Sequence, residues 1–355
     1  MELKVGVVGC GRMGAKKSNR LQSILPSGWL PISHIESVIE CEITEVHGVA
    51  DVNQHSLDYV CEQYYVDNVC HTHMDLLQQG LDILTCATRT PTKKNIIMDS
   101  IRAGVKGIYV EKPLCNNLND CKEILFEAEK NNVKLSYGVN RRFHDTYLKA
   151  KEIISSNKLG NLIEVRVDFG FAPLMWTHPH SLDLLNFFCG TPISVTAELD
   201  LLDVDISGLT SNILDGDPKI ISAKVYYANG IIGRVSRCNG NLVTLMLEKG
   251  VIIVHGDGHS LQVMTKENES SDYFSCQSFM NPMASQGATV NAIEDLASSI
   301  LNNENLKYIS NNDIYFNMAL IFGCVWSHLN GSVKIDVDNI PDDLIITGRT
   351  GEYFA

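Results

Sequence analysis

The chain opens with the stretch that decides the fold of its first half, Val5-Gly6-Val7-Val8-Gly9-Cys10-Gly11-Arg12-Met13-Gly14. Residues 3–8 form an almost continuous apolar run, which is typical of a strand buried in a parallel sheet. The glycines of Gly9-x-Gly11-x-x-Gly14 allow a tight turn, and a helix is expected over 12–24. They also let the backbone approach a pyrophosphate at the positive end of that helix. The stretch therefore predicts a dinucleotide site formed by Gly9, Gly11, Arg12, Met13 and Gly14.

Strands and helices are expected to alternate after this turn. Further strands are predicted at 43–50, 83–87, 107–110 and 133–138. The helices between them are predicted at about 54–64, 73–79, 92–103 and 117–131. Alternation of this kind indicates an α/β domain with a doubly wound parallel sheet, the Rossmann arrangement, over residues 1–140.

The pattern changes after residue 140. Residues 193–266 are rich in strands, with a hairpin turn at 228–230, and residues 267–286 are expected to form a long loop. A strand is also expected at 161–171, and helices at 145–156, 180–188, 288–302 and 311–329. Residues 141–355 are therefore predicted to form an α+β domain built on a large, mostly antiparallel sheet.

Composition narrows the classes of partner. The net charge of −13 argues against non-specific binding to nucleic acid or to an anionic membrane. No apolar run reaches the roughly 18 residues that a membrane span needs. The 11 cysteines are odd in number and form no CxxC pair, which favours reduced thiols in the cytoplasm. No zinc-ligand spacing is present, so no metal is expected.

The second strand ends at Asp51, where an acid can bind the ribose hydroxyls of a dinucleotide and repel a 2′-phosphate. This favours NAD and leaves NADP open. Asp51 lies 37 residues after Gly14, whereas the usual spacing is about 20. The sequence from Pro26 to Glu36 therefore looks like an insertion. The alternative for Asp51 is a solvated loop residue.

Two further segments follow strands of the expected sheet. Thr88-Arg89-Thr90-Pro91-Thr92 would line the cofactor crevice with Thr88 and Thr90, although Thr92 could serve only as a helix cap. Glu111-Lys112-Pro113 places a lysine near the expected nicotinamide. A desolvated lysine beside a positive ring should have a lowered pKa and could act as an acid/base. Taken alone, Lys112 would be read as a surface lysine.

Two polar segments begin the second domain. Asn140-Arg141-Arg142-Phe143 could bind a carboxylate or phosphate, or could equally be a solvated start to the next helix. In Trp176-Thr177-His178-Pro179-His180-Ser181-Leu182-Asp183, the side chains of His180 and Asp183 are expected to share a helix face. A histidine there suits proton transfer. Otherwise His178 and His180 merely cap the helix.

The order of these motifs resembles the glucose–fructose oxidoreductase, inositol dehydrogenase and rhizopine-catabolism (Gfo/Idh/MocA) family over nearly the whole chain. The resemblance implies NAD(P)-linked chemistry on a sugar, cyclitol or related hydroxyl. It also implies a homodimer or homotetramer, which in this family is often formed through an open sheet. Lys112 matches the family's Glu-Lys-Pro lysine, with Glu111 beside the cofactor. His180 resembles its substrate-site histidine, followed by Asp183.

The sequence departs from the family in two places. Trp176 stands where many members have an aspartate, and Lys93-Lys94 stand where a histidine is usual. The expected reaction is hydride transfer between a secondary alcohol and nicotinamide, with Lys112, His180 and Asp183 as catalytic residues. The pocket would be formed by Asn140, Arg141, Trp176, His178 and His180. Arg141 and Arg142 also leave an acidic sugar or a nucleotide-sugar open as substrate.

Two other functions remain open at this stage. One is an enzyme that uses NAD transiently to cleave a glycosidic bond, or that reduces imines or rings. The other is an NAD(P)-binding regulatory protein without turnover, against which the intact Glu111-Lys112-Pro113 motif argues.

Overall fold

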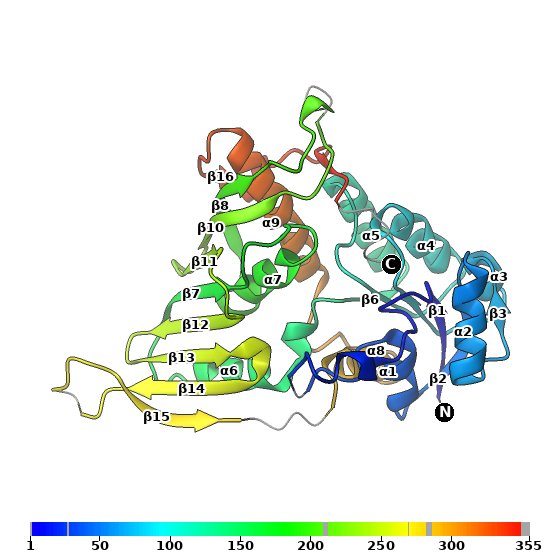
Figure 1. The fold of residues 1–355 in the computed structure, drawn as a ribbon, viewed down its shortest axis with the longest axis horizontal. Helices are drawn as coiled ribbons and strands as arrows, with labels where there is room; N and C mark the ends of the chain where they lie inside the picture. The colour runs from blue at the N-terminus through cyan, green and yellow to red at the C-terminus, as the bar shows by residue number, and fades with distance from the viewer. Residues whose placement is uncertain (1, 27, 209–211, 269, 282–285, 349–355) are drawn as a thin grey trace.

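A computed structural model of the chain describes residues 2–26, 28–208, 212–268, 270–281 and 286–348. Two β-sheets lie side by side, each covered by helices, with the N-terminus in the smaller parallel sheet (Figure 1). Among the described residues, no helix is both long and apolar enough to cross a lipid bilayer.

The first sheet has six parallel strands in the order β3-β2-β1-β4-β5-β6. The strands are β1 (Leu3–Val8), β2 (Thr44–Ala50), β3 (Val69–Cys70), β4 (Ile83–Cys86), β5 (Gly107–Val110) and β6 (Lys134–Tyr137). The connecting helices are α1 (His34–Glu40), α2 (Gln54–Tyr64), α3 (His73–Leu77), α4 (Thr90–Arg102) and α5 (Leu118–Lys130). This strand order is that of a dinucleotide-binding doubly wound sheet, and it confirms the predicted fold class.

The helix predicted over 12–24 is wrong. A single turn follows the glycines, where the Ala15 amide donates to the Gly11 carbonyl, and later only the short 3-10 helix η1 (Ser18–Leu21) forms. The amides of His34 and Ile35 instead donate to the carbonyls of Met13 and Gly14, at 2.7 and 2.9 Å. Helix α1 therefore follows directly on the first turn in space. Residues 16–32, here called the inserted loop, separate the two in the sequence.

The second sheet has nine strands in the order β15-β14-β13-β12-β7-β11-β10-β8-β16. Of these neighbouring pairs, β7 and β11 run parallel and the rest are antiparallel, as predicted. The strands are β7 (Leu162–Asp168), β8 (Pro192–Asp200), β10 (Lys219–Tyr227), β11 (Ile232–Ser236), β12 (Leu242–Leu247), β13 (Gly250–His255), β14 (Ser260–Thr265), β15 (Ser275–Met280) and β16 (Ile335–Asp336). A separate pair joins β9 (Ile213–Leu214) to β17 (Ile345–Ile346).

The loop predicted over 267–286 is wrong at its centre, because β15 lies there as the edge strand beside β14. Its sequence, Ser-Cys-Gln-Ser-Phe-Met, mixes polar and apolar side chains without strict alternation, so the pattern hides a strand that pairing with β14 stabilises. Residues 269 and 282–285 of that predicted loop lie outside the described part of the chain.

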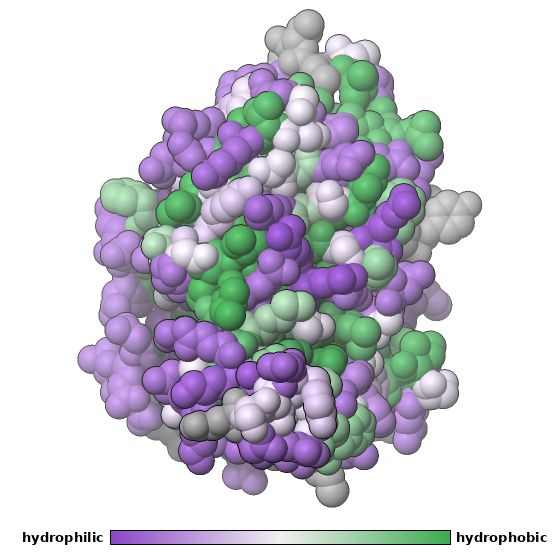
Figure 2. Space-filling model, turned by 90° about the vertical axis from the view of Figure 1, so that its left-hand side faces the viewer, coloured by the Kyte–Doolittle hydropathy of each residue, from purple (hydrophilic) through white to green (hydrophobic). Residues whose placement is uncertain are grey.

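Helices α6 (Asp145–Ser155), α7 (His178–Cys189) and α9 (Asn311–Leu329) pack on one face of the nine-stranded sheet. On the other face, charged and apolar side chains alternate, including ion pairs of 2.9 Å from Arg234 to Glu164 and from Arg166 to Asp168. The view from that side of the molecule shows hydrophobic and hydrophilic residues interspersed (Figure 2).

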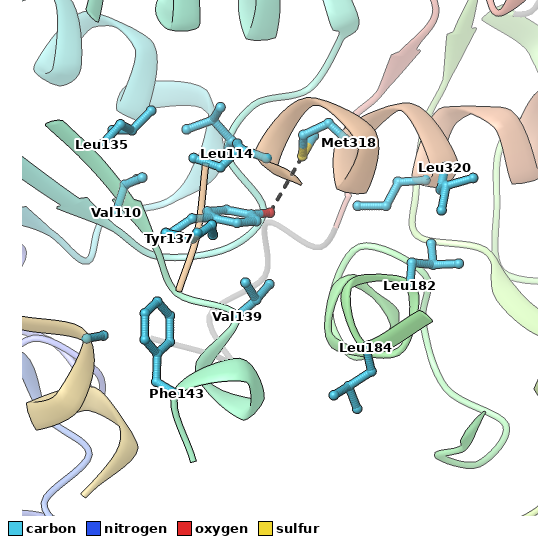
Figure 3. Packing of buried hydrophobic residues seen from close by; sticks show 14 of the residues in the cluster. Val110, Leu114, Leu135, Tyr137, Val139, Phe143, Leu182, Leu184, Met318 and Leu320 are labelled. Atoms are coloured by element: carbon cyan, nitrogen blue, oxygen red, sulfur yellow. Dashed lines mark hydrogen bonds between the residues drawn. The ribbon is translucent and has the colours of Figure 1, made fainter. Parts of the chain in front are cut away.

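Helix α8 (Ala288–Leu301) comes late in the chain but packs against β5 and β6 of the first sheet. A Cβ on Gly107 would meet Leu296 at 2.9 Å, so this glycine lets the helix approach the strand. The hydrophobic core also crosses the junction: Tyr137 of β6 points to Met318 of α9, with Leu182 of α7 facing the same helix (Figure 3). The two halves of the chain thus share one core.

Candidate functional site

The glycine turn has the shape that a dinucleotide needs. Gly9 adopts a φ of +90°, and a Cβ on Gly14 would lie 1.6 Å from the Gly9 carbonyl oxygen. Gly11 differs, because a Cβ there meets no described atom within 4 Å. Gly9 and Gly14 are therefore required by the protein itself, whereas the space beside Gly11 is open to a ligand. The backbone fits a pyrophosphate at this position.

Asp51 lies against the same turn. Its Oδ2 accepts a 2.6 Å hydrogen bond from the Cys10 amide, and its Oδ1 accepts one of 2.8 Å from the Asn53 amide. The expected strand-end acid and the expected glycine turn are thus brought together despite the long spacing in sequence. Of the other two residues of the turn, Arg12 is exposed and Met13 is half-buried.

Thr88 also borders the turn. A Cβ on Gly9 would lie 3.1 Å from the Thr88 Cγ2, which places this threonine beside the cradle. Thr90 is the first residue of α4, and Arg89 is the N-cap. Thr92 does not cap the helix; its hydroxyl donates to the Arg89 carbonyl at 2.9 Å and lies 3.0 Å from the Thr88 hydroxyl, within hydrogen-bond distance.

Lys112 lies between the two halves of the chain, just after β5. Its Nζ donates a 2.6 Å hydrogen bond to the Trp176 carbonyl and lies 4.4 Å from the centre of the Trp176 ring. Burial, together with the charges of Lys93 and Arg141, lowers the pKa of Lys112 to about 8, although Glu111 and Asp217 oppose the change. A lysine with this pKa can exchange a proton near neutral pH. Trp176 thus contributes a ring and a carbonyl where many family members have an aspartate.

Glu111 is held by a histidine that the sequence did not single out. His34, at the start of α1, places Nε2 at 3.4 Å from Glu111 Oε1, and both side chains are buried. Burial alone would raise the pKa of Glu111, but His34, Lys112 and Lys93 bring it below its ordinary value. Glu111 is therefore ionised. Gly138 leaves room for it, because a Cβ there would approach the carboxyl carbon to 3.1 Å.

His180 is half-buried in the first turn of α7. Burial, together with the charges of Arg141 and Lys112, holds the pKa of His180 well below its ordinary value. A neutral imidazole near Lys112 can accept or hold a proton. His178 behaves differently: its side chain is fully buried, its Nδ1 lies 3.0 Å from the Ser181 hydroxyl, and burial lowers its pKa to about 4. The expected role of His178 in the pocket is not supported, because the ring faces the protein interior.

The expected catalytic role of Asp183 is not supported by its surroundings. Asp183 is 1% exposed and accepts hydrogen bonds of 2.6 to 3.1 Å from the Nε and Nη2 of Arg142. Burial raises the pKa of Asp183 to about 6, although Arg142 opposes this rise. The remaining nitrogen of Arg142 donates to the Tyr308 carbonyl at 2.7 Å. Asp183 and Arg142 therefore form a buried internal ion pair.

Arg141 is also paired. Its Nε and Nη2 donate to Asp257 at 2.8 and 2.6 Å, and its guanidinium lies between the rings of Trp29 and Phe169, at 5.2 and 4.8 Å from their centres. Trp29 belongs to the inserted loop, and its Nε1 donates to the Asp257 carbonyl at 2.9 Å. The inserted loop thus reaches the second half of the chain and helps fix Arg141.

Asn140 does not line a pocket either. It is 4% exposed, accepts a 2.7 Å hydrogen bond from the Tyr109 hydroxyl and donates one of 3.0 Å to Thr289 of α8. Its expected role in substrate binding is not supported by this geometry. Asn140 connects β5 to α8 instead.

Sequence reasoning missed the roles of several residues around Glu111, Lys112 and Arg141, namely Trp29, His34, Lys93, Asp217 and Asp257. Asp217 is buried at 7% exposure, and its Oδ1 accepts a 2.7 Å hydrogen bond from the amide of Met175, next to Trp176. Lys93 precedes the buried Ile96 and Ile97 at helical spacing, and this pattern could have predicted its burial. Among the described residues, no three His, Cys, Asp or Glu side chains converge as metal ligands would.

The first part of the chain is similar in sequence to known oxidoreductases. Residues 3–139 match the model of a family, Gfo/Idh/MocA, described as "Oxidoreductase family, NAD-binding Rossmann fold". Myo-inositol 2-dehydrogenase of Thermotoga maritima is 24% identical over 166 residues, which is 46% of this chain and 44% of the relative. Inositol 2-dehydrogenase of Gluconacetobacter diazotrophicus is 27% identical over 169 residues, 46% of this chain and 45% of the relative. The chain spans less than half the length of the curated relatives it matches.

Solved structures match over nearly the whole chain and share its fold. Levoglucosan dehydrogenase, solved with NADH, has a TM-score of 0.73 at 16% identity, with 96% of this chain and all of that chain covered. Aldose-aldose oxidoreductase of Caulobacter crescentus, solved with glycerol, has a TM-score of 0.73 at 16% identity, with 95% and 100% covered. At this identity the likeness establishes the arrangement of the two sheets.

Proposed function

We propose that the chain, whose residues 3–139 match the Gfo/Idh/MocA family of NAD-binding oxidoreductases, is an NAD-dependent dehydrogenase of a neutral sugar or cyclitol. The observation that carries this proposal is the position of Lys112, at the end of β5 on the edge where the glycine turn and Asp51 also lie. Ligands of doubly wound sheets bind at this edge.

The residues of the first sheet fit NAD. Gly9, Gly11 and Gly14 would cradle its pyrophosphate, Thr88 would border it, and Asp51 would face the ribose hydroxyls. When bound, NAD supplies a nicotinamide ring that accepts or donates a hydride. The prediction that NAD is the cofactor is confirmed by the family match.

Lys112 is the proposed acid/base that transfers the substrate proton. With a pKa of about 8, a fraction of Lys112 is uncharged at neutral pH and can take the proton of a substrate hydroxyl during oxidation. In the reverse direction the ammonium returns the proton to the carbonyl oxygen. His180 is neutral and can hold the substrate hydroxyl or relay its proton. Trp176 keeps the lysine in place through its carbonyl and its ring.

A neutral substrate is favoured because the two arginines considered for an acidic group both have internal carboxylate partners. Arg141 is paired with Asp257 and Arg142 with Asp183, so their charges are compensated within the protein. The names of two matched relatives, myo-inositol 2-dehydrogenase and levoglucosan dehydrogenase, point the same way, since inositol and levoglucosan carry hydroxyl groups and no acid. Two other matched structures hold L-tartaric acid and UDP-GlcNAcA, so the neutral class rests on the pairing of the two arginines. The expected acidic sugar or nucleotide-sugar is therefore not part of the proposal.

We also propose that subunits pair through the face of the nine-stranded sheet that α6, α7 and α9 leave uncovered. That face mixes ion pairs such as Arg234 with Glu164 and half-buried apolar side chains such as Ile253, which suits contact with a second copy. Light scattering of the wild type beside Arg234→Glu tests this. A dimer or tetramer that dissociates in the variant supports it, and a monomeric wild type contradicts it.

The deciding experiment is a titration of the purified protein with NADH and NADPH, read by fluorescence, followed by a substrate panel at 340 nm. The panel contains cyclitols, neutral sugars, anhydrosugars and sugar acids, and Lys112→Ala is assayed beside the wild type. Binding of NADH with a neutral substrate whose turnover the variant loses supports the proposal. Tight binding without any turnover favours a regulatory protein, and preference for sugar acids contradicts the neutral class.

A further inference from the structure

Lys93 is a buried lysine that the proposed reaction does not use. It lies in the first turns of α4 with 1% of its surface exposed. Its Nζ donates hydrogen bonds of 2.5 Å to the Glu111 carbonyl and 2.7 Å to the Pro113 carbonyl. These two carbonyls belong to the residues on either side of Lys112. The Lys93 ammonium therefore holds both ends of the turn that carries Lys112.

Burying a lysine is unfavourable in free energy, because its charge must leave water. Two neutral hydrogen-bond donors could satisfy the same two carbonyls without that cost. The neighbouring Lys94 shows the ordinary alternative on the same helix: it is part-exposed and forms 2.6 Å ion pairs with Asp120 and Glu123. The burial of a cation at position 93 therefore calls for a role that depends on its charge.

We propose that Lys93 is a positioning residue for Lys112: it fixes the Glu111-Lys112-Pro113 turn and, as a second buried cation, favours the uncharged form of Lys112. This proposal deepens the dehydrogenase function above, because an uncharged lysine is the form that accepts a substrate proton. Activation of one lysine by a neighbouring cation is an established means of making an amine reactive near neutral pH.

The charges around Lys112 agree with this role. Lys93 and Arg141 both lower the pKa of Lys112, after burial, while Glu111 and Asp217 raise it. His180 also faces Lys112, but it is neutral at physiological pH. Arg141 is paired with the Asp257 carboxylate, whereas Lys93 donates hydrogen bonds to two neutral carbonyls, and the Glu111 carboxylate acts on it only through its charge. The hydrogen bonds of Lys93 therefore compensate its charge less than the ion pair with Asp257 compensates that of Arg141.

Lys93 itself remains mostly charged at pH 7. Burial lowers its pKa to about 8, and Cys86, Glu111 and Cys115 oppose that change. Because the two lysines titrate in the same range, loss of the proton from one makes the other easier to protonate. An arginine at position 93 would stay charged throughout this range.

The test measures the ionisation of Lys112 directly in the full-length protein. Acetic anhydride acylates uncharged amines, so the rate at which the Lys112 peptide is labelled, followed by mass spectrometry between pH 6 and 11, gives the midpoint of its titration. The proteins compared are the wild type, Lys93→Met, Lys93→Arg and the matched control Lys94→Met, each checked for folding by circular dichroism.

We expect Lys93→Met to move the Lys112 midpoint to higher pH, which lowers its labelling at pH 8 by about three- to tenfold. Lys93→Arg keeps a permanent charge and should leave the midpoint at or below that of the wild type. Lys94→Met should not change it. If Lys93→Met fails to fold, a Lys93→Arg midpoint clearly above the wild-type value overturns the proposal.

A merely structural role gives a different result. If Lys93 only holds the turn, Lys93→Met changes the labelling rate by one factor at every pH and leaves the midpoint unchanged, and this overturns the proposal. The measurement needs no substrate or cofactor. Failure of the dehydrogenase proposal in the substrate panel is therefore distinguishable from failure of this one.

Discussion

The ammonium of Lys112 donates a 2.6 Å hydrogen bond to the main-chain carbonyl of Trp176 and lies 4.4 Å from the centre of the same residue's indole ring. The carbonyl contact persists whatever side chain stands at position 176, whereas the ring contact depends on an aromatic residue. A cation over an aromatic face is stabilised by about 0.5–2 kcal/mol. The two contributions can therefore be separated by substitution.

Replacing Trp176 with aspartate should move the pH dependence of the reaction. A carboxylate near Lys112 favours its charged form and raises its pKa above the present value of about 8. Oxidation needs the uncharged lysine, so its rate rises with pH through this pKa. We expect the rising limb of kcat/KM to have its midpoint at about pH 8 in the wild type and at a higher pH in Trp176→Asp.

Trp176→Phe is the control for that substitution, because it retains an aromatic face and adds no charge. Its rising limb should stay within about half a pH unit of the wild-type position. An unchanged limb in Trp176→Asp, measured with the same substrate, would show that Lys112 does not govern the proton transfer.

Alanine substitution at two glycines of the first turn should weaken NADH binding in both cases but lower the stability in only one. A Cβ at Gly14 would overlap the Gly9 carbonyl, so Gly14→Ala should lower the melting temperature and lose NADH binding together. A Cβ at Gly11 meets no described atom within 4 Å, so Gly11→Ala should fold with the stability of the wild type. It should nevertheless weaken NADH binding at least tenfold, because the methyl group projects into the space for the pyrophosphate.

Thermal unfolding and fluorescence titration of both variants check this pair. If Gly11→Ala binds NADH as tightly as the wild type while remaining folded, the cofactor phosphates do not lie against this turn.

The ion pair between Arg142 and Asp183 should prove to be structural. Asp183→Asn removes one charge from a pair that is 1–2% exposed and leaves Arg142 with Asp313, at 3.4 Å, as its remaining carboxylate partner. We expect the free energy of unfolding, measured in urea, to fall by about 3–5 kcal/mol. Glu152→Gln breaks the exposed pair with Lys149 and should change it by less than about 0.5 kcal/mol.

A loss of stability from Asp183→Asn no greater than that of Glu152→Gln would argue for the catalytic role first expected of Asp183. In that case the variant should also lose turnover while keeping its fold.

Deleting the inserted loop should rejoin a helix. Removal of residues 16–32 connects Ala15 to Ser33, and the hydrogen bond from the His34 amide to the Met13 carbonyl then takes the ordinary helical spacing. Far-ultraviolet circular dichroism should show retained helix, and NADH binding should persist. Because Arg141 loses the ring of Trp29 and lies close enough to Lys112 and His180 to lower the pKa of both, we expect the KM for substrate to rise about five- to thirtyfold.

Trp29→Leu is the matched point variant and should reproduce most of that rise in KM. An unaltered KM in both proteins would place the inserted loop outside the substrate site, whereas loss of NADH binding in the folded deletion variant would contradict the continuous helix.

The first sheet and its glycine turn were predictable because their signals are local. Apolar runs, glycine spacing and the alternation of strand and helix each lie within a few residues, and they place Gly9, Asp51 and Lys112 at strand ends whatever the rest of the chain does. The helix over 12–24 failed for a non-local reason. The carbonyls of Met13 and Gly14, which that helix would have used, bind the amides of His34 and Ile35 across the inserted loop.

By itself, then, the sequence determined the doubly wound sheet, the cofactor edge and the lysine that stands on it. Only the tertiary structure decided what surrounds that lysine. Arg141 meets Asp257 from 116 residues away, Arg142 takes Asp183, and Lys93 reaches the carbonyls beside Lys112. The charge and reactivity of a side chain depend on burial and on such distant partners, and these exist only once the chain has packed.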